Sequence, residues 1–276
     1  MSLATIRPIV LLLRNTYLLI FIKMAITAQQ VKELRDRTGV GMMACQKALS
    51  EADGDIDRAI EILREKGEAK AASKADRETH EGQVAIHNHA IVKLLCETDF
   101  VARNEKFQAF ANELAQKASE AGVDAAKQYF ESVKTDKIQE IGENILLDSV
   151  EIVDQDGVVG SYVHSNGKLG AIVVLSGGTE EKARDVAMHA VAMNPLVANP
   201  EEVPADAIEK EKSVCAEQLK NEGKPEQIID KIIEGKIKKF CAEQALSSQA
   251  FVKDPSQTVQ EYLGDAKIVT FVRYEV

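Results

Sequence analysis

The spacing of the apolar residues changes near Gln83, and this change does most to limit the possible folds. Before it, three short stretches show the 3.6-residue period of amphipathic helices, and each is followed by a glycine: Gly39, Gly54 and Gly67. After it, segments with alternating apolar residues are interspersed with further helical stretches. The chain is therefore predicted to be α+β, with a helical N-terminal module followed by two sheet-and-helix units.

The N-terminal module carries helix start signals as well as stop signals. Thr27 and Gln30 form a capping box ahead of the first helical stretch, and Asp55 is a plausible N-cap of the third. Three short helices in fewer than fifty residues indicate a small three-helix domain, assigned to residues 24–78. The polar, alanine-rich stretch after Gly67 is either a linker or a solvated extension of the third helix.

The rest of the chain is divided into a core N-subdomain, residues 79–148, and a core C-subdomain, residues 149–276. Turn signals at Asp156-Gly157 and Asn166-Gly167 separate predicted strands. The segment that begins at Gln83 is either a strand pair with a turn at Asn88 or one strand with a break. Two helical stretches with apolar seams, joined at residues 223–225, predict an antiparallel helical hairpin arm over residues 205–247. An alternating segment at the C-terminus predicts a last strand.

The first 23 residues differ from the rest. They contain three cations and no acid, and Arg14 and Asn15 interrupt their apolar run. A membrane-spanning helix needs about 20 mostly apolar residues, and no clean small-residue cleavage site follows. Three interpretations stay open: an incorrectly assigned start with the true start at Met24, an organelle-targeting segment, or a membrane-facing tail.

Charge and cysteine content narrow the class of protein. The net charge of −10 argues against a mainly electrostatic nucleic-acid binder, and favours a protein partner or a small ligand. The four cysteines are far apart and form no Cys-x-x-Cys pair, so reduced thiols are expected and a zinc site is disfavoured.

The sequence contains no motif for phosphate binding or nucleophilic catalysis. His87 and His89 would lie on one face of an extended segment, but two imidazoles alone make a weak metal site. His189 lies in a helix between apolar neighbours and is expected to be structural. No catalytic residue, metal or cofactor is assigned.

Two pairs of residues are ambiguous when read alone. Asp99 and Phe100 stand where a strand-like segment changes into a helix start, so Phe100 could pack beneath the next helix while Asp99 accepts backbone N–H groups. Met42 and Met43 are either ordinary core or an adaptable contact surface. Because they are adjacent on a short helix and point in two directions, one of them should face outward.

Several segments in order resemble a known family. "VKELRDRTGVGMMACQKALSEADGDIDRAIEILREKG" and "CETDFVARNEKFQAFA" closely resemble the two signature regions of elongation factor Ts. "SYVHSNGKLGAIVVL", "MHAVAMNP" and "FVRYEV" resemble later family blocks, and the resemblance covers residues 24–276.

The resemblance implies a guanine-nucleotide exchange factor for elongation factor Tu. Such a factor binds the GDP-bound partner, displaces its magnesium ion, opens its nucleotide site and stays bound until GTP enters. The family fold comprises a ubiquitin-associated-like three-helix domain, two core subdomains and a helical hairpin arm. No cofactor, nucleic acid or membrane is implied, and the expected location is the cytoplasm, or an organelle matrix if residues 1–23 are a transit peptide.

The resemblance also implies roles for individual residues. Thr98, Asp99, Phe100 and Val101 match the family element that enters the partner near its magnesium ion. Phe100 would act there as an apolar wedge between partner helices, and Asp99 would disturb the polar network around the metal.

The resemblance implies further contacts with the partner. Arg35, Met42 and Met43 match positions that dock on a partner helix, and His164 matches a contact near the phosphate-binding loop. The C-terminal subdomain is expected to meet a different partner domain. Two competing hypotheses are a scaffold that binds proteins through its three-helix module and a metal-dependent enzyme around His87 and His89.

Overall fold

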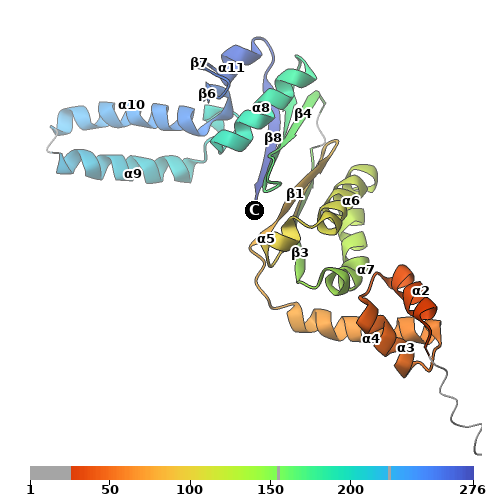
Figure 1. Cartoon of the computed structure of the whole chain (residues 1–276). Helices are drawn as coiled ribbons and strands as arrows, with labels where there is room; N and C mark the ends of the chain where they lie inside the picture. The colour runs from red at the N-terminus through yellow and green to blue at the C-terminus, as the bar shows by residue number, and fades with distance from the viewer. Residues whose placement is uncertain (1–25, 154–155, 223–224) are drawn as a thin grey trace, which may run out of the picture. The chain divides into compact units, whose positions relative to one another are not determined.

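The computed structural model describes residues 26–153, 156–222 and 225–276 (Figure 1). The predictions for residues 1–23 and for a turn at Gly223-Lys224 lie outside these residues. The described chain forms two compact units, residues 26–76 with 135–142, and residues 77–134 with 143–276.

The first unit contains the three predicted helices. They are α2 (Ala28–Thr38), α3 (Met42–Glu51) and α4 (Ile56–Lys74). The capping box of Thr27 and Gln30 forms, and Gly39 ends α2 in the left-handed conformation with a φ of 68°. Leu34, Leu49 and other buried apolar residues form the core between the helices.

Helix α4 differs from its prediction, because it continues through Gly67 to Lys74. Glycine was read as a stop signal, but Gly67 is buried within the helix. A Cβ atom at this position would collide with the side chain of Gln139. The glycine therefore permits close packing and does not end the helix.

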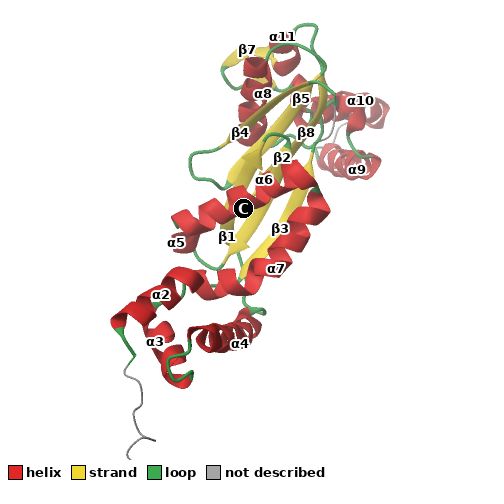
Figure 2. Cartoon of the chain, turned by 90° about the vertical axis from the view of Figure 1, so that its right-hand side faces the viewer, coloured by secondary structure: helices red, strands yellow, loops and turns green. Residues whose placement is uncertain are grey.

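The second unit begins with an antiparallel sheet in the order β1-β2-β3. Its strands are β1 (Glu81–His87), β2 (Ala90–Cys96) and β3 (Ile145–Ile152). The predicted turn at Asn88 is confirmed, with a φ of 50°. Helix α6 (Glu105–Ala121) begins at its predicted N-cap Asn104 and covers one face of this sheet (Figure 2). Its side chains Phe107, Phe110 and Leu114 are buried.

The start of β3 was missed. The sequence was read as a strand beginning near Ser149 and belonging to the second subdomain, whereas β3 begins at Ile145 and pairs with β2. The boundary placed between residues 148 and 149 falls inside this strand. The remaining division into two subdomains stays a prediction.

A second antiparallel sheet has the order β4-β5-β8. Its strands are β4 (Val158–Val163), β5 (Leu169–Leu175) and β8 (Ile268–Glu275). Helix α8 (Glu180–Met193) lies on one face, so closely that a Cβ atom at Gly160 would meet its backbone. The other face packs against the first sheet through a shared apolar cluster that includes Val84, Ile91, Ile172 and Val174.

The predicted helical hairpin is present as α9 (Ala205–Asn221) and α10 (Glu226–Gln244), which lie side by side (Figure 1). Cys215, Leu219 and Ile229 are buried along its seam. The remaining elements are α5 (Asp99–Ala102), α7 (Val123–Ile141), η1 (Pro200–Glu202), η2 (Leu246–Ser248), β6 (Ala250–Phe251), β7 (Asp254–Thr258) and α11 (Val259–Leu263). The α+β fold class is confirmed.

All four cysteines are free thiols, and three of them are buried. Within the described residues, no helix is both long and apolar enough to cross a membrane.

His189 has the structural place that its apolar neighbours suggested. Its ring is fully buried on α8, and Nδ1 accepts a hydrogen bond of 3.1 Å from the Val252 N–H group. The neutral ring therefore carries its proton on Nε2, which lies 3.0 Å from Oε1 of Gln249. Burial lowers the pKa of this imidazole, against the raising effect of the Gln249 hydrogen bond.

A lowered pKa at His189 predicts a loss of stability in acid. The unfolded chain takes up a proton at this imidazole near pH 6.5, whereas the folded chain does so only at lower pH. The contribution of His189 to the free energy of unfolding is therefore fully present above about pH 7. It falls as the pH drops below about 6.5, by up to about 1.4 kcal/mol per pH unit for this one proton. Urea unfolding followed by circular dichroism from about pH 7.5 to 5.5 should show a shallower loss in His189→Asn, whose amide oxygen can replace Nδ1 as acceptor. Equal slopes in both proteins would contradict this account.

Candidate partner-binding site

Residues 97–104 join β2 to α6 and form an exposed tip. Strand β2 ends at Cys96, and the one-turn helix α5 follows with Thr98 as its N-cap. The Thr98 hydroxyl accepts a hydrogen bond from the Val101 N–H group at 3.4 Å. Ala102 is buried, whereas Phe100 on the same turn is 83% exposed. Packing of Phe100 beneath the following helix is therefore excluded.

Asp99 does not cap the turn as its position suggested. Thr98 has that role, because its hydroxyl stands before the first residue of α5. The Asp99 carboxylate instead lies 3.2 Å from Nη2 of Arg103, one turn later on the same surface. This acidic side chain is half-buried beside the exposed ring of Phe100.

A residue that the sequence did not single out, Glu143, holds the base of the tip. Its Oε2 atom accepts hydrogen bonds of 3.0 Å from the N–H groups of Glu97 and Thr98. Its Oε1 atom accepts a 2.6 Å hydrogen bond from the Thr98 hydroxyl. One carboxylate thus engages three donors at the start of the tip.

The reciprocal contact comes from Glu97. Its Oε1 atom accepts a hydrogen bond of 2.7 Å from the N–H group of Asn144. The Glu97 carboxylate also lies 3.3 Å from Nη1 of Arg77. Two side chains therefore cross-link the ends of β2 and β3 where backbone pairing stops.

The side chain of Cys96 also contacts the base of the tip, at Thr98. Two causes raise the pKa of its thiol to about 12: burial, which has the larger effect, and the negative charge of nearby Glu143. The thiol therefore stays protonated at neutral pH, and it donates a hydrogen bond of 3.3 Å to the Thr98 carbonyl. Cys96 is a structural thiol here and not a nucleophile.

A groove of about 550 Å³ beside the tip brings together two residues that the sequence analysis named separately. Asp99 and Arg103 line one part of it, and His164 lines another. His164 is exposed in the turn between β4 and β5, and its Nδ1 atom lies 3.2 Å from the Tyr162 hydroxyl. The structure thus places His164 and the tip on one concave surface.

The turn that carries His164 is attached to the first sheet. The Val84 N–H group donates a 2.8 Å hydrogen bond to the Gly167 carbonyl. Nζ of Lys168 also lies 2.5 Å from the Glu81 carboxylate. Because β1 and β2 belong to the same sheet, these contacts help fix the distance between His164 and the tip.

Arg35, Met42 and Met43 belong to the first unit. Met42 and Met43 are the first residues of α3 and are 54% and 80% exposed, so both side chains point outward. The sequence predicts that one of the two faces outward, whereas both do, because Cys45, Ala48 and Leu49 occupy the core-facing side of α3. Arg35 is exposed on α2.

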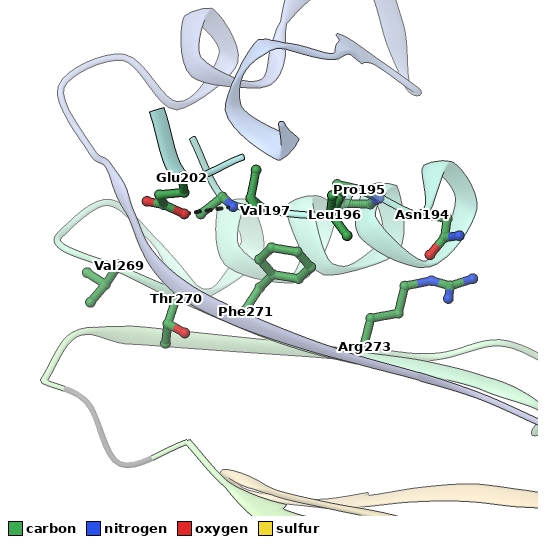
Figure 3. Close-up of a pocket in the computed structure, with 10 residues that line it drawn as sticks. Asn194, Pro195, Leu196, Val197, Glu202, Val269, Thr270, Phe271 and Arg273 are labelled. Carbon is green, nitrogen blue, oxygen red and sulfur yellow. Dashed lines mark hydrogen bonds between the residues drawn. The ribbon is translucent and has the colours of Figure 1, made fainter. Parts of the chain in front are cut away.

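A second cavity, of about 410 Å³, lies between β8 and the loop after α8 (Figure 3). The Phe271 ring lies beneath this loop, with Arg273 towards one end and Glu202 towards the other. Glu202 accepts a hydrogen bond from the Ala198 N–H group at 3.1 Å, and Arg273 pairs with Glu275 at 2.8 Å. Glu202 thus helps to hold the loop, and Arg273 is paired within its own strand.

The two histidines considered for a metal site lie on either side of Asn88, which forms a turn with a φ of 50°. His87 ends β1, and His89 lies in the following turn. In the described parts of the chain, no three or more His, Cys, Asp or Glu side chains are grouped as metal ligands would be.

Comparison with known proteins identifies the family. The family model described as "Elongation factor TS" matches residues 97–276. A protein named elongation factor Ts from a Nitratiruptor species is 45% identical over 285 aligned positions, which cover 92% of this chain and 93% of the relative.

Two further relatives carry the same name. The protein from Deinococcus deserti is 45% identical, with 90% of this chain and 98% of the relative covered. The protein from Teredinibacter turnerae is 47% identical, with 92% and 91% covered. A family match over more than half of the chain, together with this identity over nearly its whole length, shows that the chain belongs to the elongation factor Ts family.

Proposed function

We propose that the chain is a guanine-nucleotide exchange factor for elongation factor Tu. It binds the GDP-bound partner, loosens the magnesium ion and opens the nucleotide site, and it stays bound until GTP enters. It carries no hydrolytic or transfer chemistry of its own. Its place of action is the cytoplasm, or an organelle matrix if residues 1–23 act as a transit peptide.

The exposure of Phe100 carries this proposal. A large aromatic ring that is 83% exposed leaves apolar surface in water, which is unfavourable in the free protein. The ring stands on a turn whose base is held by Glu143, Cys96 and the buried Ala102. Such an arrangement suits insertion of the ring into another protein.

The other site residues have supporting roles in the proposal. Asp99 stands beside Phe100 and would disturb the polar network around the partner's magnesium ion. His164 shares the groove with Asp99 and would contact the region of the phosphate-binding loop. Arg35, Met42 and Met43 would dock on a partner helix through the exposed face of the first unit.

Burial of one side chain supplies too little free energy to displace GDP from the partner. A partner that binds GDP at nanomolar affinity does so with about −12 kcal/mol. Shifting such a state decisively requires a difference in affinity of about 10⁴-fold, or about 5.5 kcal/mol. Full burial of one Phe side chain is worth about 1.5–3 kcal/mol. The remainder must come from docking through other surfaces, which favours a contact that uses both units.

The direct test is release of a fluorescent GDP analogue from elongation factor Tu. The purified chain at micromolar concentration is expected to accelerate release, and the acceleration should saturate as its concentration rises. Excess magnesium should reduce the effect, because the exchange factor and magnesium-bound GDP weaken each other's binding by the same factor. Absence of any acceleration at micromolar concentration would refute the proposal.

A further inference from the structure

We infer that Glu143 is the positioning residue of the exchange tip, a role that rests on the function proposed above. Its carboxylate would hold Thr98 so that α5 presents Phe100 in a single orientation. Glu143 itself is half-buried at the base of the tip and belongs to the segment before β3. It acts through Thr98 and not by contact with the nucleotide.

Backbone pairing between β2 and β3 ends just before the tip. The ladder between β2 and β3 stops at the pair Cys96 and Ile145. The next residues along β2 would leave two N–H groups unpaired. Glu143 accepts hydrogen bonds from both of them at 3.0 Å, so one side chain continues the cross-strand contact beyond the sheet.

The polar atoms of Thr98 are all engaged. Its N–H and hydroxyl groups donate to Glu143, and its hydroxyl oxygen accepts from Val101. Its carbonyl accepts from the Cys96 thiol and from the Ala102 N–H group. This arrangement fixes both the backbone and the χ1 angle of the residue that caps α5.

Helix α5 is only one turn long. A helix of one turn is unstable by itself, because helix nucleation is unfavourable and few hydrogen bonds compensate for it. Its geometry must therefore come from its attachments. Ala102 anchors one end in the core, and the contact between Thr98 and Glu143 anchors the other.

The chemistry of the three donors explains why a glutamate suits this position. An ionised carboxylate can accept all three hydrogen bonds, and hydrogen bonds to a charged acceptor are stronger than neutral ones. Glutamine has one acceptor oxygen, so one of the three contacts must reverse its direction. Aspartate is one methylene shorter, so its carboxylate would stand farther from the donors of Glu97 and Thr98 beyond the end of β2.

The test that does not require the partner uses tip mobility. The chain contains no tryptophan, so Phe100→Trp introduces a single fluorescent reporter at the tip. In this background, Glu143→Ala should lower the time-resolved anisotropy of the reporter through faster local motion. Glu113→Ala is the matched control, because Glu113 is also half-buried and accepts a 2.5 Å hydrogen bond from Tyr129, away from the tip. Unchanged anisotropy in a folded Glu143→Ala protein would overturn the inference.

The test with the partner uses exchange kinetics in the chain that retains Phe100. Glu143→Ala should lower the maximal rate of GDP release by roughly ten- to 100-fold, with a smaller change in the half-saturating concentration. Glu143→Gln should lose only about threefold, since two contacts can be kept. Glu143→Ala and Thr98→Ala should be non-additive, because both remove the same contact.

The outcomes separate the inference from the proposed function. Should the unsubstituted chain release no GDP, the proposed function fails, while the anisotropy result still decides whether Glu143 holds the tip. An equal loss of melting temperature and rate in both Glu143→Ala and Glu143→Gln, with additive effects of Thr98→Ala, would show that Glu143 is merely structural.

Discussion

Replacement of Phe100 by alanine is expected to lower the maximal rate of GDP release by roughly ten- to 150-fold. This range corresponds to the loss of about 1.5–3 kcal/mol for burial of one aromatic side chain. The melting temperature should not fall, because the ring is 83% exposed and contributes little to the folded core. The measurement combines stopped-flow release of a fluorescent GDP analogue with thermal unfolding of the same preparation.

The matched control is Leu146→Ala, an apolar side chain on β3 that is 42% exposed. It should leave the release rate within about twofold of the unsubstituted chain, since surface substitutions away from a site have small effects. Phe100→Leu should be intermediate, because it keeps part of the apolar surface. Loss of exchange in step with loss of helical circular dichroism would instead assign Phe100 to the fold.

The effect should fall on the rate and less on affinity. A group whose contact forms only after the magnesium site has opened stabilises the open state and not the initial complex. In the proposed mechanism Phe100 would be such a group, because it would enter between partner helices only as the nucleotide site opens. Its removal therefore leaves docking through the other surfaces in place.

Much of the fold could be predicted from local signals. The capping box at Thr27, the N-cap at Asn104 and the turn at Asn88 act within a few residues, and each appears where the sequence placed it. The hairpin arm was predictable from its apolar seams. These elements are specified by neighbours along the chain, which makes them readable without the tertiary structure.

Two predictions of element boundaries were wrong, the end of α4 and the start of β3, because contacts between distant residues decide both. Gly67 was read as a helix stop, although its lack of a side chain accommodates Gln139 in the folded unit. The start of β3 was missed because its pairing with β2 joins residues about fifty positions apart. Glycine and strand signals have more than one structural meaning, and the distant partner decides between them.

In the candidate site, too, local sequence predicts some residues, whereas contacts between distant residues determine others. Asp99, Phe100 and His164 could be proposed from sequence segments, but only the structure brings Asp99 and His164 into one groove. Glu143 could not have been chosen, because it is one acid among many and its partner Thr98 lies 45 residues away. The useful signal is its position two residues before a strand whose partner strand leads into the tip.

Replacement of both Met42 and Met43 by alanine is expected to raise the half-saturating concentration by roughly ten- to 100-fold and to leave the maximal release rate nearly unchanged. The two side chains are exposed in the free chain and would be buried on docking, with about 1.5–3 kcal/mol available for each if burial were complete. A docking contact formed equally in every nucleotide state changes affinity without changing the rate from the bound complex. Titration of the double variant against a fixed amount of the GDP-loaded partner measures both quantities.

The control in the same unit is Glu65→Ala, an exposed position on α4 that should leave both quantities unchanged. Alanine keeps the helix propensity of α3, so circular dichroism of the double variant should match the unsubstituted chain. A fall in maximal rate with unchanged half-saturation would contradict docking, because it would place the methionines among groups that act only in the open state. Additivity of the logarithmic effects of the methionine pair and Phe100→Ala would show that docking and nucleotide release use separate contacts of the same chain.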